Sequence, residues 1–183
     1  MTHKDRAEWD ERYAEAGPAP VGELVLPPFF EANEHLFPTT GRALEIACGR
    51  GRGAVWLATR GLEVWGLDVS GVAVGLARDL AERSGVGHRC SFDVVDLDGG
   101  LPDGPPVDVV LCHLFRDPRL DNAIIDRLSP GGLLAIAVLS EVDVGPGPFR
   151  AAPGELRSAF ASLDVIDQGE RDGKAWLLAT APA

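Results

Sequence analysis

A glycine-rich segment that follows an apolar run is the part of the chain best suited to hold a ligand: Glu45-Ile46-Ala47-Cys48-Gly49-Arg50-Gly51-Arg52-Gly53. Glycine lets the backbone approach a ligand closely and adopt positive φ angles where a turn needs them. Gly49, Gly51 and Ala54 also satisfy a loose G-x-G-x-x-[GA] dinucleotide pattern. The segment therefore favours a nucleotide phosphate or an adenosine that carries an amino-acid tail.

Three acidic residues, Glu45, Asp68 and Asp96, lie at the ends of successive apolar runs. Ligands of open α/β sheets bind beyond the carboxyl ends of the strands, so these carboxylates are expected near one ligand. Glu45 suits a ligand with an ammonium group and a sulfonium cation, and Asp68 can accept both hydroxyls of a ribose. Asp96 can accept from an adenine amino group, with Leu97 beside the ring. A helix cap or a solvated charge is the alternative for each acid, and Asp68 fits NAD equally well.

Apolar runs alternate with helical patterns around these residues. A first helix carries Trp9 and Tyr13 on one face, and Thr2 with Asp5 could form its capping box. Residues 17–20 end that helix, and 24–37 are expected to be a loop followed by a short helix. Strands are predicted over 42–47, 62–68, 90–96, 107–112 and 133–139, with helices over 53–60, 70–80, 117–128 and 153–160.

The end of the chain departs from this alternation. Segments 164–166 and 175–180 are predicted strands joined through Asp172-Gly173, a pair suited to a type I′ hairpin. The turn residues 129–132 are predicted to end the preceding helix. Alternating strands and helices predict parallel pairing with helices on both faces. We therefore expect a Rossmann-like α/β fold: a mostly parallel seven-stranded sheet with an antiparallel C-terminal strand.

Composition excludes several classes of protein. The formal net charge of −11 argues against binding to nucleic acid or to an anionic membrane surface. No stretch approaches the ~20 apolar residues of a membrane span, and the first residues lack the apolar core of a signal peptide. Cys48, Cys90 and Cys112 fit neither a disulfide framework nor a zinc site, and are expected to be small buried hydrophobic residues. These features predict a cytoplasmic protein without a metal.

Taken in order, ALEIACGRGRG, VWGLDVS, FDVVDLD, VDVVLC and LSPGGLLAIAV resemble the motifs of class I S-adenosylmethionine-dependent methyltransferases. Near the ends, residues 9–13 (WDERY) and 153–157 (PGELR) with Phe160 are similar to small tellurite-resistance-type and thiopurine-type methyltransferases. The resemblance implies one domain over residues 1–183. Residues 1–40 would form an N-terminal helical cap or lid, and 41–183 a Rossmann-like core that binds the cofactor.

The resemblance implies S-adenosylmethionine as the cofactor and methyl transfer to a small molecule as the activity. Gly49 and Gly51 would border the methionine part, and Glu45 would hold its amino group directly or through water. Asp68 would bind the ribose, Cys112 would lie near the transferring methyl group, and Val69 would be a second adenine contact. The expected cofactor-binding residues are Trp9, Glu45, Ala47, Cys48, Gly49, Gly51, Asp68, Val69, Ser70, Asp96, Leu97 and Cys112.

The acceptor is expected between the first helix and the loops after the fourth and fifth strands. The candidate acceptor-binding residues on these segments are Trp9, Arg12, Tyr13, His113, Phe115 and Arg116. Catalytic roles are predicted for His113, Arg12 and Tyr13. His113 has an unperturbed pKa near ~6.5 and could deprotonate an acceptor, while Arg12 or Arg116 could orient an anionic one. A structural histidine, a packing pair of aromatic rings and solvated arginines are the alternatives. Arg50 and Arg52 either face solvent or recruit an anionic acceptor.

Two other functions fit the same residues. One is a non-catalytic module that binds S-adenosylmethionine or S-adenosylhomocysteine. The other is an NAD(P)-dependent oxidoreductase, although 183 residues leave little room for its substrate region. We expect a monomer or a homodimer whose partner is a small-molecule acceptor, and a protein acceptor stays open.

Overall fold

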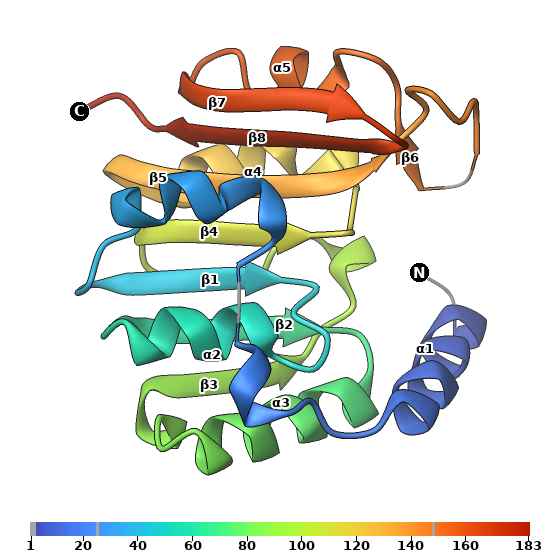
Figure 1. The fold of residues 1–183 in the computed structure, drawn as a ribbon, viewed down its shortest axis with the longest axis vertical. Helices are drawn as coiled ribbons and strands as arrows, with labels where there is room; N and C mark the ends of the chain where they lie inside the picture. The colour runs from blue at the N-terminus through green and yellow to red at the C-terminus, as the bar shows by residue number, and fades with distance from the viewer. Residues whose placement is uncertain (1–2, 25, 148) are drawn as a thin grey trace.

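The structure, a computed structural model, describes residues 3–24, 26–147 and 149–183. Within these residues, eight strands form one sheet in the order β3-β2-β1-β4-β5-β8-β7, with the short β6 beside β5 (Figure 1). The strands are β1 Arg42–Ile46, β2 Glu63–Asp68, β3 Cys90–Val94, β4 Val107–His113, β5 Leu128–Ser140, β6 Arg150–Ala151, β7 Asp164–Arg171 and β8 Lys174–Thr180.

Strand pairing confirms the predicted mostly parallel sheet. The pairs β1–β2, β1–β4, β2–β3 and β4–β5 are parallel, and β8 runs antiparallel to both β5 and β7. The turn that joins β7 to β8 has positive φ at Asp172 and Gly173, 51° and 71°, as the predicted type I′ turn requires. The two-residue β6 is the strand that the prediction of seven strands omitted.

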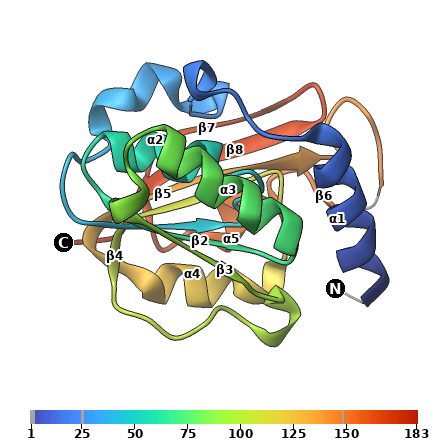
Figure 2. The ribbon, with the colours of Figure 1, turned by 90° about the horizontal axis from the view of Figure 1, so that it is seen from below.

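Helices cover both faces of the sheet (Figure 2). One face packs against α2, α3 and η2 through side chains such as Phe30, Leu57 and Leu80, and the other against α4 and α5 through Ile124 and Leu156. The helices are α1 His3–Ala16, α2 Arg52–Thr59, α3 Gly71–Arg83, α4 Asp121–Arg127 and α5 Glu155–Ala159, and the 3₁₀ helices are η1 Val21–Glu23, η2 Pro28–Leu36, η3 Gly87–Arg89, η4 Leu97–Gly99 and η5 Pro118–Leu120.

The start of β5 corrects one sequence prediction. Residues 129–132 were expected to be a turn between a helix and the fifth strand, but they lie within β5, which begins at Leu128. Opposite them the register with β4 shifts between Val107 and Val109, and Gly131 has a φ of 71°. The Gly131 amide donates to the carbonyl of Ala181, 3.1 Å away. The turn residues therefore make an irregular strand start, because pairing with neighbouring segments outweighs their local preference.

The predicted capping box of Thr2 with Asp5 lies outside the described residues. In the part of the chain that the structure describes, no helix is long and apolar enough to cross a membrane. Cys48 and Cys112 are buried and Cys90 is half-buried, and all three are free thiols, in agreement with the expectation of small hydrophobic residues.

Candidate functional site

The glycine-rich loop connects β1 to α2 at the carboxyl edge of the sheet. The Cys48 amide donates to the carbonyl of Leu67 on β2, and the Gly51 amide donates to the carbonyl of Cys48, both at 2.9 Å. Gly51 has a φ of 75°, and a Cβ placed there would lie 2.7 Å from Cβ of Ala77. Gly51 therefore lets the loop pack directly on α3.

Ala47 shares the left-handed backbone conformation of the loop, with a φ of 54°. A non-glycine residue pays about 1–2 kcal/mol for this conformation. Ala47 was predicted to contact the cofactor, but its residue type carries no signal for this backbone angle. A strained residue at this point indicates that the course of the loop is set by its surroundings.

Asp68 ends β2 and fastens the same loop. Its carboxylate accepts from the Gly49 amide at 2.8 Å and from the Ser70 amide at 2.9 Å, one bond to each oxygen. Asp68 is 5% exposed, and burial raises the pKa of its carboxyl while these backbone hydrogen bonds lower it. Each carboxylate oxygen can accept a second hydrogen bond, so the group retains acceptor capacity for a ligand.

Glu45 lies beneath the loop, where its carboxylate accepts from the Ala54 amide in the first turn of α2 at 2.6 Å. A Cβ on Gly53 would lie 2.3 Å from Oε1 of Glu45, so glycine is required above the carboxyl group. The pKa of Glu45 is raised from 4.5 to about 8, mainly by burial and also by the negative charge of Asp68, against the lowering effect of the Ala54 hydrogen bond. Glu45 thus caps α2, and its contact with a cofactor stays a prediction.

The other predicted cofactor contacts differ in exposure. Asp96 is exposed and accepts from the Asp98 amide at 3.0 Å, so it caps η4, whereas Leu97 and Val69 are buried. Cys112 is 1% exposed, packs in the core on the α4 side, and its thiol donates to the carbonyl of Phe115. The structure brings these residues to the carboxyl edge but buries the Cys112 side chain away from the glycine loop.

Helix α1 lies across the carboxyl edge, beside α3 (Figure 1). Asp10 accepts from the Ser70 hydroxyl at 2.5 Å and from the Val72 amide at 3.3 Å, which joins α1 to the first turn of α3. Arg50 donates to the carbonyls of Ala16 and Gly17, at 3.2 and 3.0 Å. Arg50 is half-buried and caps the end of α1 with these two bonds. Neither interaction was predicted, because nothing in the sequence around Asp10 or Arg50 indicates its partner.

Tyr13 is the residue of α1 that reaches the glycine loop. A Cβ on Gly49, whose φ is 52°, would lie 2.9 Å from the Tyr13 hydroxyl, so glycine makes room for it. Burial and the charge of Asp68 raise the pKa of Tyr13 well above its usual value, which keeps the phenol protonated. Trp9 stacks on Tyr13 with ring centroids 5.7 Å apart, and Arg12 lies 5.0 Å above the Trp9 ring.

His113 ends β4 and is half-buried. Burial lowers its pKa from 6.5 to about 4, and the positive charges of Lys174 and Arg52 act in the same direction. Its imidazole is therefore neutral at pH 7. Arg116, by contrast, has a side chain that is 4% exposed and donates to Asp121 and Glu155. Arg116 holds α4 and α5 together, and the prediction that it orients an acceptor receives no support.

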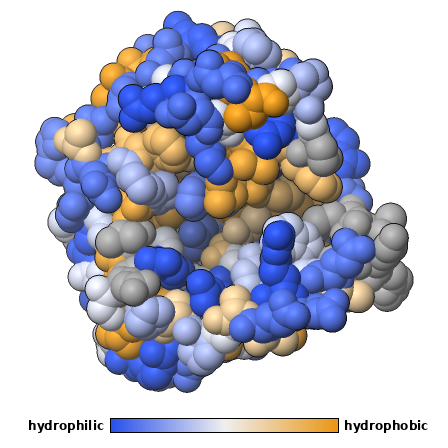
Figure 3. All heavy atoms as spheres, turned by 45° about the vertical axis from the view of Figure 1, so that its right-hand side comes forward, coloured by the Kyte–Doolittle hydropathy of each residue, from blue (hydrophilic) through white to orange (hydrophobic). Residues whose placement is uncertain are grey.

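Exposed apolar side chains gather at the same edge. Leu114, Val144 and Phe149 are 48%, 52% and 75% exposed and lie on the segments that follow β4 and β5. Leu114 and Phe149 also have positive φ angles of 61° and 59°, uncommon for such large side chains. Figure 3 shows a hollow with apolar atoms on its walls between α1 and the segment that follows β5. These features suit a small apolar ligand.

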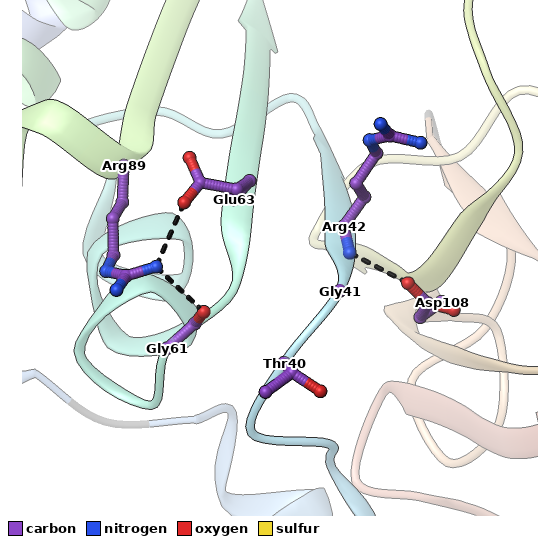
Figure 4. Close-up of a pocket in the computed structure, with 7 residues that line it drawn as sticks. All are labelled: Thr40, Gly41, Arg42, Gly61, Glu63, Arg89 and Asp108. Carbon is purple, nitrogen blue, oxygen red and sulfur yellow. Dashed lines mark hydrogen bonds and ion pairs between the residues drawn. The ribbon is translucent and has the colours of Figure 1, made fainter.

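A separate cavity of about 470 Å³ opens at the amino ends of the strands (Figure 4). Arg89 donates to Glu63 and to the carbonyl of Gly61, at 2.9 and 3.0 Å, and the Arg42 amide donates to Asp108. The polar groups that line this cavity thus largely form hydrogen bonds with one another. None of the predicted site residues lines this cavity, which lies at the opposite edge of the sheet from the glycine loop. The lining residues are Thr40, Gly41, Arg42, Gly61, Glu63, Arg89 and Asp108.

The chain is similar in sequence and in fold to several known proteins. Residues 43–132 match the family described as methyltransferase domain. An uncharacterized protein of Synechococcus is 33% identical over 141 residues, which cover 72% of this chain and 31% of that protein. A 2-heptyl-1-hydroxyquinolin-4(1H)-one methyltransferase of Mycobacteroides abscessus is 27% identical over 139 residues, covering 69% of this chain and 60% of that enzyme. The chain thus spans from about a third to three fifths of the length of these two relatives.

Among solved structures, TehB from Haemophilus influenzae superposes with a TM-score of 0.73 at 16% identity, covering 94% of this chain and 67% of that one. At this identity the similarity establishes the fold. The overall fold of this chain is thus a known architecture.

Proposed function

We propose that the chain is a class I S-adenosylmethionine-dependent methyltransferase that transfers a methyl group from S-adenosylmethionine to a small-molecule acceptor. The match of residues 43–132 to the methyltransferase-domain family and the fold shared with TehB support this proposal. The observation that carries this proposal is the position of the Asp68 carboxylate, which is held by the amides of Gly49 and Ser70 at the mouth of the glycine loop. This acid retains acceptor capacity where a ribose would lie.

The residues at the loop fit this cofactor. The two acids Glu45 and Asp68 suit a ligand with an ammonium group and a positively charged sulfur. Among the described residues, both carboxylates accept hydrogen bonds from backbone amides, and neither pairs with a lysine or arginine. Gly49 and Ala47 would border the methionine part, and Asp68 would hold the ribose. The predicted adenine contacts Val69, Asp96 and Leu97 follow β2 and β3 at the same edge.

When bound, the cofactor supplies an electrophilic methyl group on a sulfonium. The contribution of this chain is to hold the acceptor against that carbon, since alignment of two reactants can lower a barrier by about 7–11 kcal/mol. The Tyr13 hydroxyl lies over Gly49 and Trp9 stacks on the Tyr13 ring, so this pair would shield the loop from water on the α1 side. His113 is neutral at pH 7 and can accept a hydrogen bond or a proton, although a pKa of about 4 makes it a weak base.

Other parts of the proposal concern the whole protein. We propose that residues 1–183 form one domain, that it works as a monomer or a homodimer, and that it is cytoplasmic. The net charge of −11 supports a small molecule over a nucleic acid as acceptor. The name of the Mycobacteroides relative, a quinolone methyltransferase, supports the same class.

Two measurements test the proposed function. Thermal shift and titration calorimetry with S-adenosylhomocysteine and with NAD compare the two adenosine ligands, and we expect binding of the former alone. Mass spectrometry of reactions with S-adenosylmethionine and a set of small acceptors then detects S-adenosylhomocysteine. Binding of NAD without S-adenosylhomocysteine would refute the proposal, and tight binding without turnover on any acceptor would favour a non-catalytic module.

A further inference from the structure

Three basic side chains from separate elements meet at one corner of the carboxyl edge: His113 of β4, Lys174 of β8 and Arg52 of α2. In the sheet, His113 pairs with Ala137 of β5, and Lys174 pairs with Leu139, two residues further along β5. Paired residues share a face, as do residues two apart on one strand, so His113 and Lys174 project from the same face. That face is the one covered by α2, which begins at Arg52.

The charges that act on His113 are positive, although the chain has 28 acidic residues against 17 lysines and arginines. Lys174 and Arg52 both act on His113 and lower its pKa. Arg150 of β6 lies nearby, because its Nη1 is 3.2 Å from the position a Cβ of Gly173 would take, and it donates to the carbonyl of Ser140. The acids of the adjoining described segments are Glu141, Asp143 and Asp172, and the Asp143 carboxylate accepts from the Asp172 amide at 2.9 Å.

The corner adjoins the apolar rim formed by Leu114, Val144 and Phe149. Leu114 directly follows His113, and its amide donates to the carbonyl of Ala137 at 2.7 Å. Val144 lies against the turn before Lys174, with Cγ2 3.0 Å from the position of a Cβ on Gly173. Basic side chains and exposed apolar side chains therefore lie on adjoining segments of this corner.

We propose that the methyl acceptor is a small organic anion, whose negative group lies beside Lys174 and His113 and whose apolar part packs against the rim of Leu114, Val144 and Phe149. This rests on the proposed function and specifies its substrate class. An anionic acceptor atom forms the bond to the methyl carbon, and the electron pair of the carbon–sulfur bond leaves with the sulfur. No proton has to be removed in this step, so the neutral imidazole of His113 is sufficient.

The test uses benzoate and its neutral isostere benzamide as probes, with S-adenosylhomocysteine present. The imidazole shift of His113, assigned with His113→Gln, is followed by NMR through pH titrations, and sodium sulfate at equal ionic strength controls for screening. A bound anion stabilises the imidazolium, so benzoate should raise the pKa of His113 and benzamide should not. Benzoate should also bind about fivefold more tightly than benzamide, as expected for one charge interaction at a partly exposed site.

Three variants locate the effect. Lys174→Gln should raise the pKa of His113 without any probe and should abolish the preference for benzoate, whereas Lys174→Arg should keep it. Arg157→Gln removes one positive charge from an exposed position on α5, on the opposite face, and should change neither quantity. Urea unfolding of each variant establishes that it is folded.

The outcomes separate this inference from the proposed function. Suppose that the protein binds S-adenosylhomocysteine but binds benzoate and benzamide equally well, or that benzoate does not change the pKa of His113. Either result would overturn the inference that the acceptor is an anion and would leave the proposed methyltransferase function intact. Failure to bind S-adenosylhomocysteine would instead remove the proposed function and this inference with it.

Discussion

Replacement of Glu45 by glutamine should remove much of the pH dependence of folding stability. Burial raises the pKa of Glu45 from 4.5 to about 8 in the folded protein. The stability linked to such a group is fully present below pH 4.5 and is lost as the pH rises through 8. A shift of this size corresponds to about 5 kcal/mol of unfolding free energy. Glutamine can still accept from the Ala54 amide but does not ionise.

Urea unfolding followed by tryptophan fluorescence at pH 5, 7 and 9 measures this effect. In the wild-type protein, Glu45 should account for a loss of about 2.5 kcal/mol from pH 5 to 7 and about 1.4 kcal/mol more by pH 9. The pKa of Asp68 is also raised, but Asp68 is present in both proteins, so the difference between their curves isolates Glu45. Parallel curves, within about 0.5 kcal/mol, would refute the reasoning that Glu45 is buried and uncharged.

The same carboxyl group links pH to ligand binding. An ammonium group placed beside Glu45 favours its ionised form, so S-adenosylhomocysteine should release close to one proton per molecule bound at pH 7. Calorimetry in buffers of different ionisation enthalpy counts the protons. If the Glu45→Gln variant released the same number of protons per ligand bound, the proton would come from another group. Glu45 would then not be the residue that binds the amino group of the ligand.

Three further substitutions test the site. Ala47→Gly should raise the free energy of unfolding by about 0.5–1 kcal/mol because it removes the strain of a left-handed alanine, and a decrease in urea unfolding would contradict that backbone. Asp68→Ala should abolish binding of S-adenosylhomocysteine in calorimetry and also cost about 2–4 kcal/mol, because two buried amides lose their acceptor; unchanged affinity would exclude Asp68 from the site. Arg50→Gln should speed hydrogen exchange of α1 several-fold, whereas the exposed Arg12→Gln should not, and equal protection would show that Arg50 does not hold α1.

The parts of the structure that local sequence chemistry determines were predicted well. Strand and helix periods, the glycine loop after the first strand and the Asp172-Gly173 turn depend on neighbours within a few residues. The start of β5 was wrong because the residues at 129–132 have the composition of a turn, and only their pairing with β4 and with Ala181 decides otherwise.

The candidate site was predictable in its acids and glycines but not in its basic residues. Arg50 and Arg52 are separated by one residue, yet Arg50 caps α1 and Arg52 acts on His113. The position of Lys174 beside His113 follows from the strand order β4-β5-β8, which no local pattern specifies. Glu45 and Asp96 were proposed as ligand contacts, with helix capping as the alternative, and the structure shows that both cap helices.

The place of β8 between β5 and β7 has a consequence for biosynthesis. Strand β5 pairs with β4 on one side, but its other side is completed by residues 174–180, which the ribosome makes about forty positions later. During that interval the nascent sheet ends in an unpaired apolar strand that includes Leu134, Ile136 and Val138. Such an edge attracts other chains. Slow translation of the β7–β8 hairpin should therefore favour aggregation of this protein more than a pause elsewhere.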